Sequence, residues 1–268
     1  MTSDPAIAPA RPPYRRSAVG YDGLYLPKKN FRSEVSKLVR ILRRESGPTA
    51  GDWLEVACGT GLHVASLPAA FRTEGLDASR EMLALARKRC PHVPFHAGDM
   101  RTFDLGRRFD VVSCLFSSIG YMTTKADLDR AIANFARHTR EGGVVIVEPW
   151  FTPTAYRPGT IHMDAIEGRS RRATHQVRMI VAKRRGRVSV MDAHHLVGTP
   201  AGVEHFVERH EMGLFTRSEY AVAFRAAGLE PVYDRKGISD RGLYLGFKAL
   251  APTRRLPIRR SPTLRARG

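Results

Sequence analysis

The chain has few cysteines and no long apolar run. Only three of its 268 residues are cysteine, at positions 58, 90 and 114, and no two of them form a C-x-x-C pair. This excludes a disulfide framework and a cysteine-based zinc site, and it fits a reducing cytoplasm. No segment approaches the ~18 apolar residues that a membrane helix needs, so an integral membrane protein is excluded. Residues 1–13 have no apolar core of the kind found in secretory signals, so we expect no signal peptide.

Acidic residues are also scarce. The sequence has 26 Asp and Glu against 44 Lys and Arg, a net charge of +18. The excess is clustered: residues 251–268 hold six arginines and no acid, and residues 167–187 carry a net +7. Such clusters indicate a polyanionic partner, an anionic small substrate or a merely solvated basic surface. A nucleic-acid partner is the weaker interpretation, because residues 167–187 contain no interleaved aromatic residue for base stacking.

What the chain does contain is a repeated alternation of strand and helix patterns up to residue 150. Alternation of this kind predicts an α/β fold, a mostly parallel doubly wound sheet with helices on both faces. The predicted strands are residues 53–57, 73–76, 93–96, 109–116 and 144–148, and the predicted helices are residues 31–45, 62–70, 79–89 and 125–137.

The pattern changes after residue 150. Partial alternation over 173–182, 187–196 and 203–214 predicts an antiparallel β meander inserted into the α/β fold. A helix at 216–228 and strands at 229–233 and 243–247 then complete the sheet. We therefore predict five parts: a flexible N-terminal segment (1–20), a cofactor-binding α/β body (21–150), the antiparallel insertion that forms a substrate pocket or dimer interface (151–214), the closing helix and strands (215–250), and an Arg-rich disordered tail (251–268).

The strongest motif is the loop Glu55-Val-Ala-Cys-Gly-Thr-Gly61, which follows the first predicted strand. Its glycines allow a ligand to approach the backbone closely at the carboxyl edge of the sheet. The dinucleotide fingerprint G-x-G-x-x-G is broken by valine at position 64, and no Walker Lys-Ser/Thr follows. Asp77 closes the second strand, where a carboxylate can accept both hydroxyls of a ribose. Asp99 and Met100 follow the third strand and can hold an adenine amino group and ring face.

No metal site is predicted. His194 and His195 are consecutive in a predicted strand, so their side chains face opposite sides. His205 and His210 lack a carboxylate partner at ligand spacing.

Beyond these single residues, the chain resembles the class I S-adenosylmethionine-dependent methyltransferases over residues 14–250. Within that class it is most similar to the N,N-dimethyltransferases of nucleotide-linked amino sugars of the desosamine and mycaminose type. The matching stretches are LEVACGTGLHV (54–64), HAGDMRTFDLGRRFDVV (96–112), LFSSIGYM (115–122), GVVIVEPWF (143–151), LFTRSEYAVAFRAAGL (214–229) and RGLYLG (241–246). Two departures stand out: Glu55 replaces an Asp, and LPKKNF (26–31) replaces a GKD-Tyr type run.

The resemblance implies S-adenosyl-L-methionine as cofactor and assigns roles to individual residues. The implied cofactor-binding residues are Tyr21, Phe31, Glu55, Ala57, Gly59, Gly61, Asp77, Asp99, Met100, Leu115 and Phe116. The implied substrate-binding residues are Tyr14, Tyr121, Glu148, Trp150 and Arg241, of which Tyr121 and Glu148 are the catalytic candidates.

The function expected from this resemblance is N,N-dimethylation of the amine of a (d)TDP-linked amino-deoxysugar in natural-product biosynthesis. We expect a cytoplasmic enzyme that forms a homodimer and binds neither membrane nor nucleic acid. One alternative is an N-methyltransferase of another small amine or a peptide amine. An alternative of a different class is a protein that binds or methylates nucleic acid.

Overall fold

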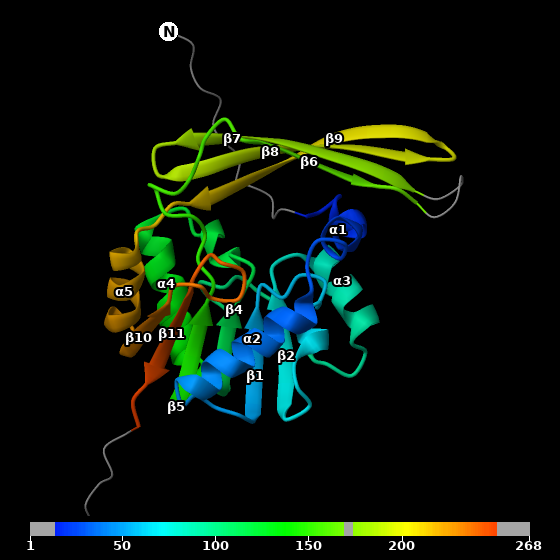
Figure 1. The fold of residues 1–268 in the computed structure, drawn as a ribbon. Helices are drawn as coiled ribbons and strands as arrows, with labels where there is room; N and C mark the ends of the chain where they lie inside the picture. The colour runs from blue at the N-terminus through cyan, green and yellow to red at the C-terminus, as the bar shows by residue number, and fades with distance from the viewer. Residues whose placement is uncertain (1–13, 169–173, 251–268) are drawn as a thin grey trace, which may run out of the picture.

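A computed structural model describes residues 14–168 and 174–250, and its core is a seven-stranded sheet (Figure 1). The strand order is β10-β11-β5-β4-β1-β2-β3. All neighbours from β5 to β3 are parallel, whereas β11 pairs antiparallel with both β5 and β10. The strands are β1 (Gly51–Val56), β2 (Phe71–Asp77), β3 (Phe95–Ala97), β4 (Phe109–Cys114), β5 (Thr139–Val147), β10 (Leu229–Asp234) and β11 (Leu243–Lys248).

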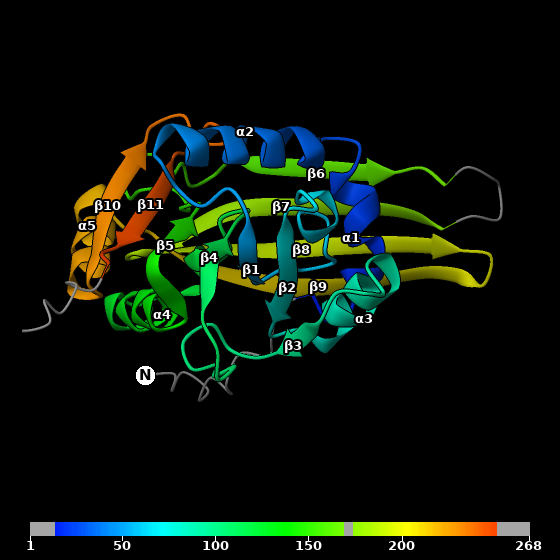
Figure 2. The same ribbon diagram turned by 90° about the horizontal axis from the view of Figure 1, so that it is seen from below.

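Helices cover both faces of this sheet, as predicted (Figure 2). On one face α2 (Phe31–Arg44) buries Leu38 and Leu42 against Trp53 and Val144. On the other, α4 (Lys125–Arg137) and α5 (Arg217–Ala226) pack against the alternate residues of the same strands, such as Leu54. Both faces are buried, which explains why the central strands read as continuous apolar runs. The remaining helices are α1 (Ala18–Tyr25), α3 (Arg80–Arg89) and the short 3₁₀ turns η1 (Val64–Ser66) and η2 (Ser118–Tyr121).

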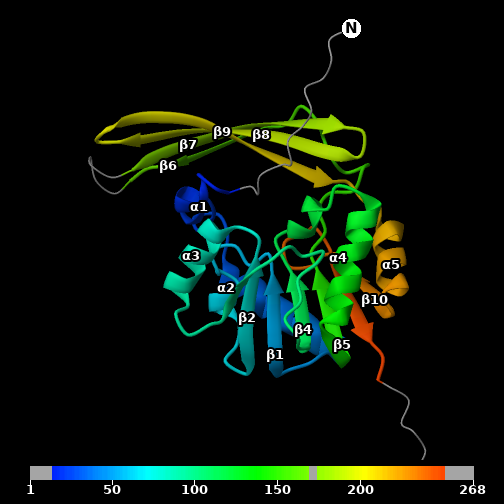
Figure 3. The same ribbon diagram turned by 180° about the vertical axis from the view of Figure 1, so that it is seen from behind.

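A second, four-stranded antiparallel sheet lies across the carboxyl ends of the parallel strands (Figures 1 and 3). It consists of β6 (Ile161–Ile166), β7 (His175–Arg185), β8 (Val188–Thr199) and β9 (Gly202–Gly213), in that order. Its inner face, with Gln176, His195 and His210, looks toward the α/β body and is largely buried. The predicted antiparallel insertion is therefore present, with one strand, β6, that the sequence patterns did not reveal.

Two sequence-based predictions differ from the structure. The helix predicted at 62–70 is only η1, because Pro68 forces Leu67 into an extended conformation (ψ 146°). Residues 14–20, predicted as part of a flexible segment, are folded: Ser17 and Ala18 are buried, and α1 begins at Ala18. The rest of the predicted flexible segment and the Arg-rich tail lie outside the described residues. Among the described residues no helix is long and apolar enough to cross a membrane.

Candidate active site

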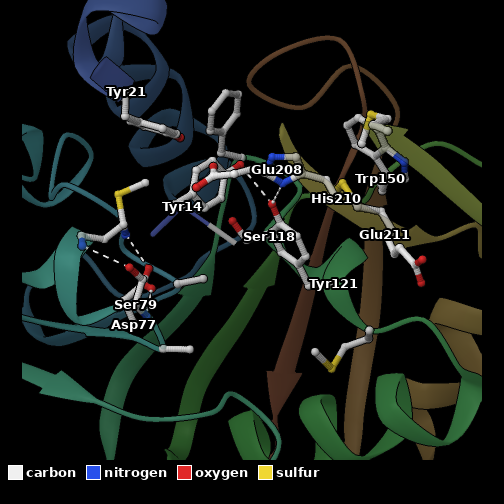
Figure 4. A pocket seen from close by; sticks show the side chains of 18 of the residues that line it. Tyr14, Tyr21, Asp77, Ser79, Ser118, Tyr121, Trp150, Glu208, His210 and Glu211 are labelled. Atoms are coloured by element: carbon white, nitrogen blue, oxygen red, sulfur yellow. Dashed lines mark hydrogen bonds between the residues drawn. The ribbon is translucent and has the colours of Figure 1, made fainter. Parts of the chain in front are cut away.

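A cavity of about 1710 Å³ lies between the carboxyl ends of the parallel strands and the inner face of the second sheet. Asp77 and Ser79 lie at one end, Trp150 lies at the other, and Tyr14, Tyr121 and His210 stand between them (Figure 4). The helix α1 covers this space and contributes Tyr21 and Tyr25 to its lining. The predicted site residues that line the cavity are Tyr14, Tyr21, Ala57, Gly59, Asp77, Asp99, Met100, Phe116, Tyr121, Trp150 and Arg241.

The two glycines of the first loop have different tasks. Gly59 has φ +56°, and a Cβ added there would meet no atom within 4 Å, so its backbone is open to a ligand. Gly61 has φ +79°, and an added Cβ would lie 3.3 Å from the Cβ of Ala86 on α3. Gly61 therefore allows the loop to pack against a helix, and it does not line the cavity. Ala57 also has a positive φ (56°), a strained conformation that this loop holds at the cavity wall.

Asp77 is fixed by the loop that it faces. Its two carboxylate oxygens accept hydrogen bonds from the backbone N–H groups of Gly59 and Ser79, each over 2.8 Å. Burial raises the pKa of Asp77, although these backbone hydrogen bonds act in the opposite direction. Each oxygen keeps a second lone pair, which is what a bidentate contact to a ribose requires. Asp77 and the open loop thus fit the adenosyl part of S-adenosylmethionine.

Asp99 lies along the same wall and is held by Arg101. Its carboxylate accepts from the Arg101 backbone N–H (2.8 Å) and from the Arg101 side-chain Nε (3.0 Å). The hydrogen bond from the guanidinium lowers the pKa of Asp99, so this acid remains charged. Met100 lies beside it, almost completely buried.

A cluster of aromatic side chains crosses the middle of the cavity. The Tyr121 hydroxyl donates to the Tyr14 hydroxyl oxygen (3.0 Å) and also lies 2.9 Å from Nδ1 of His210. Burial raises the pKa of both tyrosines above their ordinary value of 10, and burial lowers the pKa of His210 to about 4. All three groups are therefore neutral at physiological pH. Tyr21 packs edge-on against Tyr14, with ring centroids 5.3 Å apart.

Arg241 marks the far end of the cavity. Its guanidinium lies 5.0 Å from the Trp150 ring and 5.2 Å from the Phe151 ring, and Nη1 donates to Ser117 Oγ over 3.0 Å. No carboxylate of the described residues forms a salt bridge with it. A stacked guanidinium with free donors is suited to a phosphate or carboxylate oxygen.

Five predicted site residues do not line the cavity. Glu148 is almost completely buried, and its carboxylate accepts from the Phe116 N–H (2.6 Å) and from Ser239 Oγ. It therefore holds Phe116, whose φ is +52°, and its side chain does not line the cavity. Glu55 lies under the loop, hydrogen-bonded to Ser113, and burial raises its pKa to about 7. The others are Gly61, Leu115, which belongs to the core, and Phe31, which packs against His63.

Sequence reasoning missed several residues of the site. His210 was considered only as a metal ligand, whereas the fold brings it to Tyr121 and close to Glu208. Glu208 accepts from the Arg16 N–H (2.8 Å), the Ser17 N–H (3.2 Å) and Ser17 Oγ, and so ties the start of α1 to β9. No local pattern reveals such contacts between residues nearly 200 positions apart.

Comparison with known proteins places this geometry in a family. Residues 54–143 match the family described as "Methyltransferase domain". The chain is 43% identical over 230 residues to the dTDP-3-amino-3,6-dideoxy-alpha-D-glucopyranose N,N-dimethyltransferase of Streptomyces fradiae, covering 85% of this chain and 89% of the relative.

Solved structures agree. Streptomyces venezuelae DesVI has a TM-score of 0.79 and 40% identity, covering 87% of this chain and 98% of that one. The S-adenosylmethionine-bound amino pentose methyltransferase CalS10 has a TM-score of 0.75 and 35% identity, covering 90% and 100%. The class I fold, the enzymatic activity and the cofactor expected from the sequence are thereby confirmed. The chain belongs to the family of S-adenosylmethionine-dependent sugar N-methyltransferases.

Proposed function

We propose that this protein transfers methyl groups from S-adenosylmethionine to the amine of a dTDP-linked amino-deoxysugar, twice on the same nitrogen. The observation that carries the proposal is the single continuous cavity of about 1710 Å³. Ligand pockets commonly measure ~300–1,000 Å³, so this one has room for two ligands end to end. The cofactor would occupy the end with Asp77 and Gly59, and the sugar nucleotide the end with Trp150 and Arg241.

The residues at the acceptor end suit a nucleotide-linked sugar. Arg241, stacked on Trp150, can form bidentate hydrogen bonds to a diphosphate. The tyrosine pair and His210 lie between this end and Asp77, where the amine of the sugar would meet the methyl group. The relatives from Streptomyces fradiae and Streptomyces venezuelae are named for dTDP-linked amino sugars, which supports the same acceptor class here.

Positioning is the contribution we assign to the neutral groups in the middle of the cavity. The leaving group in methyl transfer from a sulfonium needs no acid, so the enzyme has to align the amine and exclude water. Such alignment is worth ~7–11 kcal/mol of the barrier. A buried phenol is a poor base, because burial holds the pKa of Tyr121 above 10. Tyr14, Tyr121 and His210 therefore orient the amine through hydrogen bonds, and a secondary amine can occupy the same place.

The direct test is mass spectrometry of the protein with S-adenosylmethionine and a panel of dTDP-linked 3-amino and 4-amino-6-deoxyhexoses. We expect one or two added methyl groups on one sugar. Simple amines, amino acids and bulk RNA serve as comparison acceptors. Methylation of a free amine with no modification of any sugar nucleotide would overturn the assignment of the acceptor, while leaving the activity as an N-methyltransferase.

The nucleic-acid alternative finds little support in the charges of the second sheet. Three basic side chains of β7 are paired with carboxylates: Arg178 with Asp164 (Nε to Oδ2, 2.9 Å), Arg185 with Glu211 (2.8 Å) and Lys183 with Asp192 (3.5 Å). Arg184 instead donates to the backbone carbonyls of Gly186 and Pro153. Ion pairs of β7 with β6, β8 and β9 thus neutralise part of the positive charge of this sheet and leave fewer cations free for phosphates. We also propose a cytoplasmic location, because all three cysteines are free thiols.

We further propose that the protein is a homodimer that associates through the outer face of the second sheet. Eight exposed apolar side chains alternate with the buried residues on this face: Ile161, Met163, Val177, Met179, Val181, Leu196, Val203 and Val207. The same face also carries His194, His205 and the charged side chains of Lys183, Asp192 and Arg209. Monomeric proteins rarely expose a contiguous apolar patch of this kind. Strand length and spacing give the face an area of roughly 700 Å². A standard interface buries ~800 Å² on each partner. The area of this face is close to that value, so a second copy of the same face can bury the exposed apolar side chains.

The charged side chains of the same face are held in ion pairs, Lys183 and Arg209 with Asp192 and Arg185 with Glu211, so three cations face two anions and the charge that two copies bring together is small. Sedimentation equilibrium should give twice the monomer mass of 29.9 kDa, and Met179→Glu should give the monomer. Val222→Glu on α5, also an exposed apolar position, is the matched control and should remain dimeric. A wild-type monomer at micromolar concentration, or a dimer that survives Met179→Glu, would refute the interface.

A further inference from the structure

The segment that precedes α1 is docked on the inner face of β9. Alternate residues of a strand point to the same side, so one row of side chains on this face is formed by Glu204, Phe206, Glu208 and His210. The Arg16 guanidinium forms an ion pair with the first of them and lies 4.4 Å from the centroid of the Phe206 ring. The ring of Tyr14 lies 4.9 Å from the ring of His210, centroid to centroid. Residues 14–17 thus follow the strand closely (Figure 4).

Glu208 makes the central contact of this row. Its Oε1 accepts hydrogen bonds from the backbone N–H groups of Arg16 (2.8 Å) and Ser17 (3.2 Å), and its Oε2 accepts from Ser17 Oγ. Ser17 precedes the first residue of α1, but its hydroxyl caps no N–H of that helix and is used for Glu208 instead. Burial alone would raise the pKa of Glu208, but these hydrogen bonds outweigh it, and the net shift is downward. The carboxylate is therefore charged, which makes it a strong acceptor.

Tyr14 has a backbone conformation that needs such support. Its φ is +70°, and a residue other than glycine keeps this conformation only where the surrounding structure holds it. The Tyr14 hydroxyl accepts a hydrogen bond from Tyr121 in the middle of the cavity. Glu208 holds the chain two and three residues further on, so its contacts fix the backbone that carries the Tyr14 ring.

The helix α1 has a second attachment, at the cofactor end. Asp22 accepts a hydrogen bond from Thr60 Oγ1 in the glycine loop (2.6 Å) and is paired with Arg89 of α3. Nε of Arg89 also donates to the Thr60 carbonyl (2.9 Å). Loss of the contacts with Glu208 should therefore release residues 14–17 and leave α1 in place over the cofactor end.

We propose that Glu208 is a positioning residue, which places Tyr14 at the middle of the cavity by holding the backbone of Arg16 and Ser17 on β9. The inference deepens the proposed function and rests on it, because Tyr14 is one of the groups that orient the amine. Glu208 itself lines the cavity, so the rival explanation is a direct contact with the acceptor. Ser17 offers a way to separate the two, because it is buried and does not line the cavity.

The kinetic test uses the dTDP-linked amino sugar that the wild type methylates. Glu208→Ala should lower kcat/KM for this sugar about 10-fold, and Ser17→Ala, which removes one of the three hydrogen bonds, about 3-fold. Glu208→Gln keeps an acceptor for the two N–H groups and should recover part of the loss. A double variant with Glu208→Ala and Tyr14→Ala should be no worse than Tyr14→Ala alone, because the effect passes through Tyr14. The control is Glu230→Gln, exposed on β10, which should match the wild type.

Docking of the segment can be measured without any acceptor. Trypsin cleaves after arginine, and the bond between Arg16 and Ser17 is protected while Glu208 holds both residues. Limited digestion of the full chain, followed by mass spectrometry, should show this cleavage at least 10-fold faster in Glu208→Ala than in wild type. Titration calorimetry should give an affinity for S-adenosylhomocysteine within 2-fold of wild type, because the attachment through Asp22 remains.

Three results would overturn the role of Glu208. Losses that add in the double variant, with Ser17→Ala unchanged, would assign Glu208 to a direct contact with the acceptor. An unchanged rate of cleavage would mean that Glu208 does not hold the segment. An equal loss of affinity for S-adenosylhomocysteine would mean that Glu208 supports the whole fold, and thermal melting of each variant checks this. If no sugar nucleotide is methylated, the acceptor assignment fails, and the digestion still decides whether Glu208 holds the segment.

Discussion

The two ends of the cavity are built in different ways. At the cofactor end, Ala57, Gly59, Asp77 and Asp99 come from one stretch of the α/β body, each after the end of successive parallel strands. Toward the acceptor end, the lining residues come from widely separated parts of the chain. They are Tyr121 and His210 in the middle of the cavity, with His210 on β9 of the second sheet, and Trp150 and Arg241 at the far end. The comparison teaches that the cofactor end is fixed by local connections, whereas the acceptor end depends on how the second sheet docks. Substrate choice can therefore change while cofactor binding is retained.

We expect the largest effect from a substitution that disrupts ligand binding at the cofactor end of the cavity. Asp77→Ala removes the acceptor for the N–H groups of Gly59 and Ser79 and the expected partner of the ribose. Hydrogen bonds to a charged group contribute about 1.5–3 kcal/mol each, so we expect at least ~100-fold weaker binding of S-adenosylhomocysteine. Titration calorimetry measures this loss of affinity. Binding of 5′-methylthioadenosine, which keeps the ribose but lacks the amino-acid group, should be weakened equally. A change in the dissociation constant of S-adenosylhomocysteine below 3-fold would contradict the role of Asp77.

A second prediction concerns stability beneath the same end. Burial raises the pKa of Glu55 from 4.5 to about 7, so between those values the folded protein holds a proton that the unfolded chain has lost. The contribution of Glu55 to the free energy of unfolding is therefore present at low pH and declines as pH rises through 4.5 to 7. From the size of the shift we expect a decline of about 3 kcal/mol.

Urea unfolding at pH 5 and pH 8 isolates this group when wild type is compared with Glu55→Gln. The variant keeps a hydrogen-bonding partner for Ser113 but has no proton to lose, so its stability should fall less by about 3 kcal/mol. Glu230→Gln, at an exposed position, should follow the wild type. If the free energy of unfolding changes with pH by the same amount in wild type and in Glu55→Gln, Glu55 titrates at its ordinary pKa and the prediction is wrong.

The same comparison explains what could be predicted from the sequence. Asp77 and Gly59 were predictable because strand ends and glycine loops leave local patterns, and the parallel sheet then brings them together. Lys125–Arg137 was predicted to the residue because Thr124 caps it and its apolar face repeats at helical spacing. Glu148 was assigned to the substrate by the family resemblance, but in the structure its two carboxylate oxygens accept hydrogen bonds from Phe116 and Ser239. The contact between His210 and Tyr121 depends on sheet docking, which leaves no local pattern.

The third prediction concerns a substitution that weakens substrate binding at the acceptor end and leaves the cofactor end unchanged. Arg241→Met keeps the apolar contact with Trp150 but removes the donors for a diphosphate. One hydrogen-bonded charged contact is worth about 1.5–3 kcal/mol, so KM for the sugar nucleotide should rise roughly 10- to 100-fold. Affinity for S-adenosylhomocysteine should remain within 2-fold. Arg43→Met, exposed on α2, is the control. A rise in KM for the cofactor instead would mean that the two ends are not independent.

The smallest effect is expected at the middle of the cavity. Tyr121→Phe removes the hydroxyl that bonds to Tyr14 and lies beside His210, but keeps the ring. Because burial holds the pKa of Tyr121 above 10, the phenolate is scarce at pH 7.5 and the hydroxyl acts only in orientation. We expect kcat to fall less than ~10-fold, far short of the 10²–10⁴-fold that loss of a general base typically costs.

The pH profile decides between the two roles of Tyr121. If the hydroxyl only orients the amine, the ratio of wild-type to variant kcat should stay constant from pH 7 to pH 9, since ionisation of the substrate affects both alike. If the hydroxyl passes a proton to His210, the ratio should be largest at pH 7, where most of the amine is protonated, and should shrink as the pH rises. In that case the ratio of wild-type kcat to the kcat of His210→Asn, measured over the same pH range, should decline with pH in the same way. A constant small ratio would assign the acceptor end to positioning, with the methyl donor supplied by the better defined cofactor end.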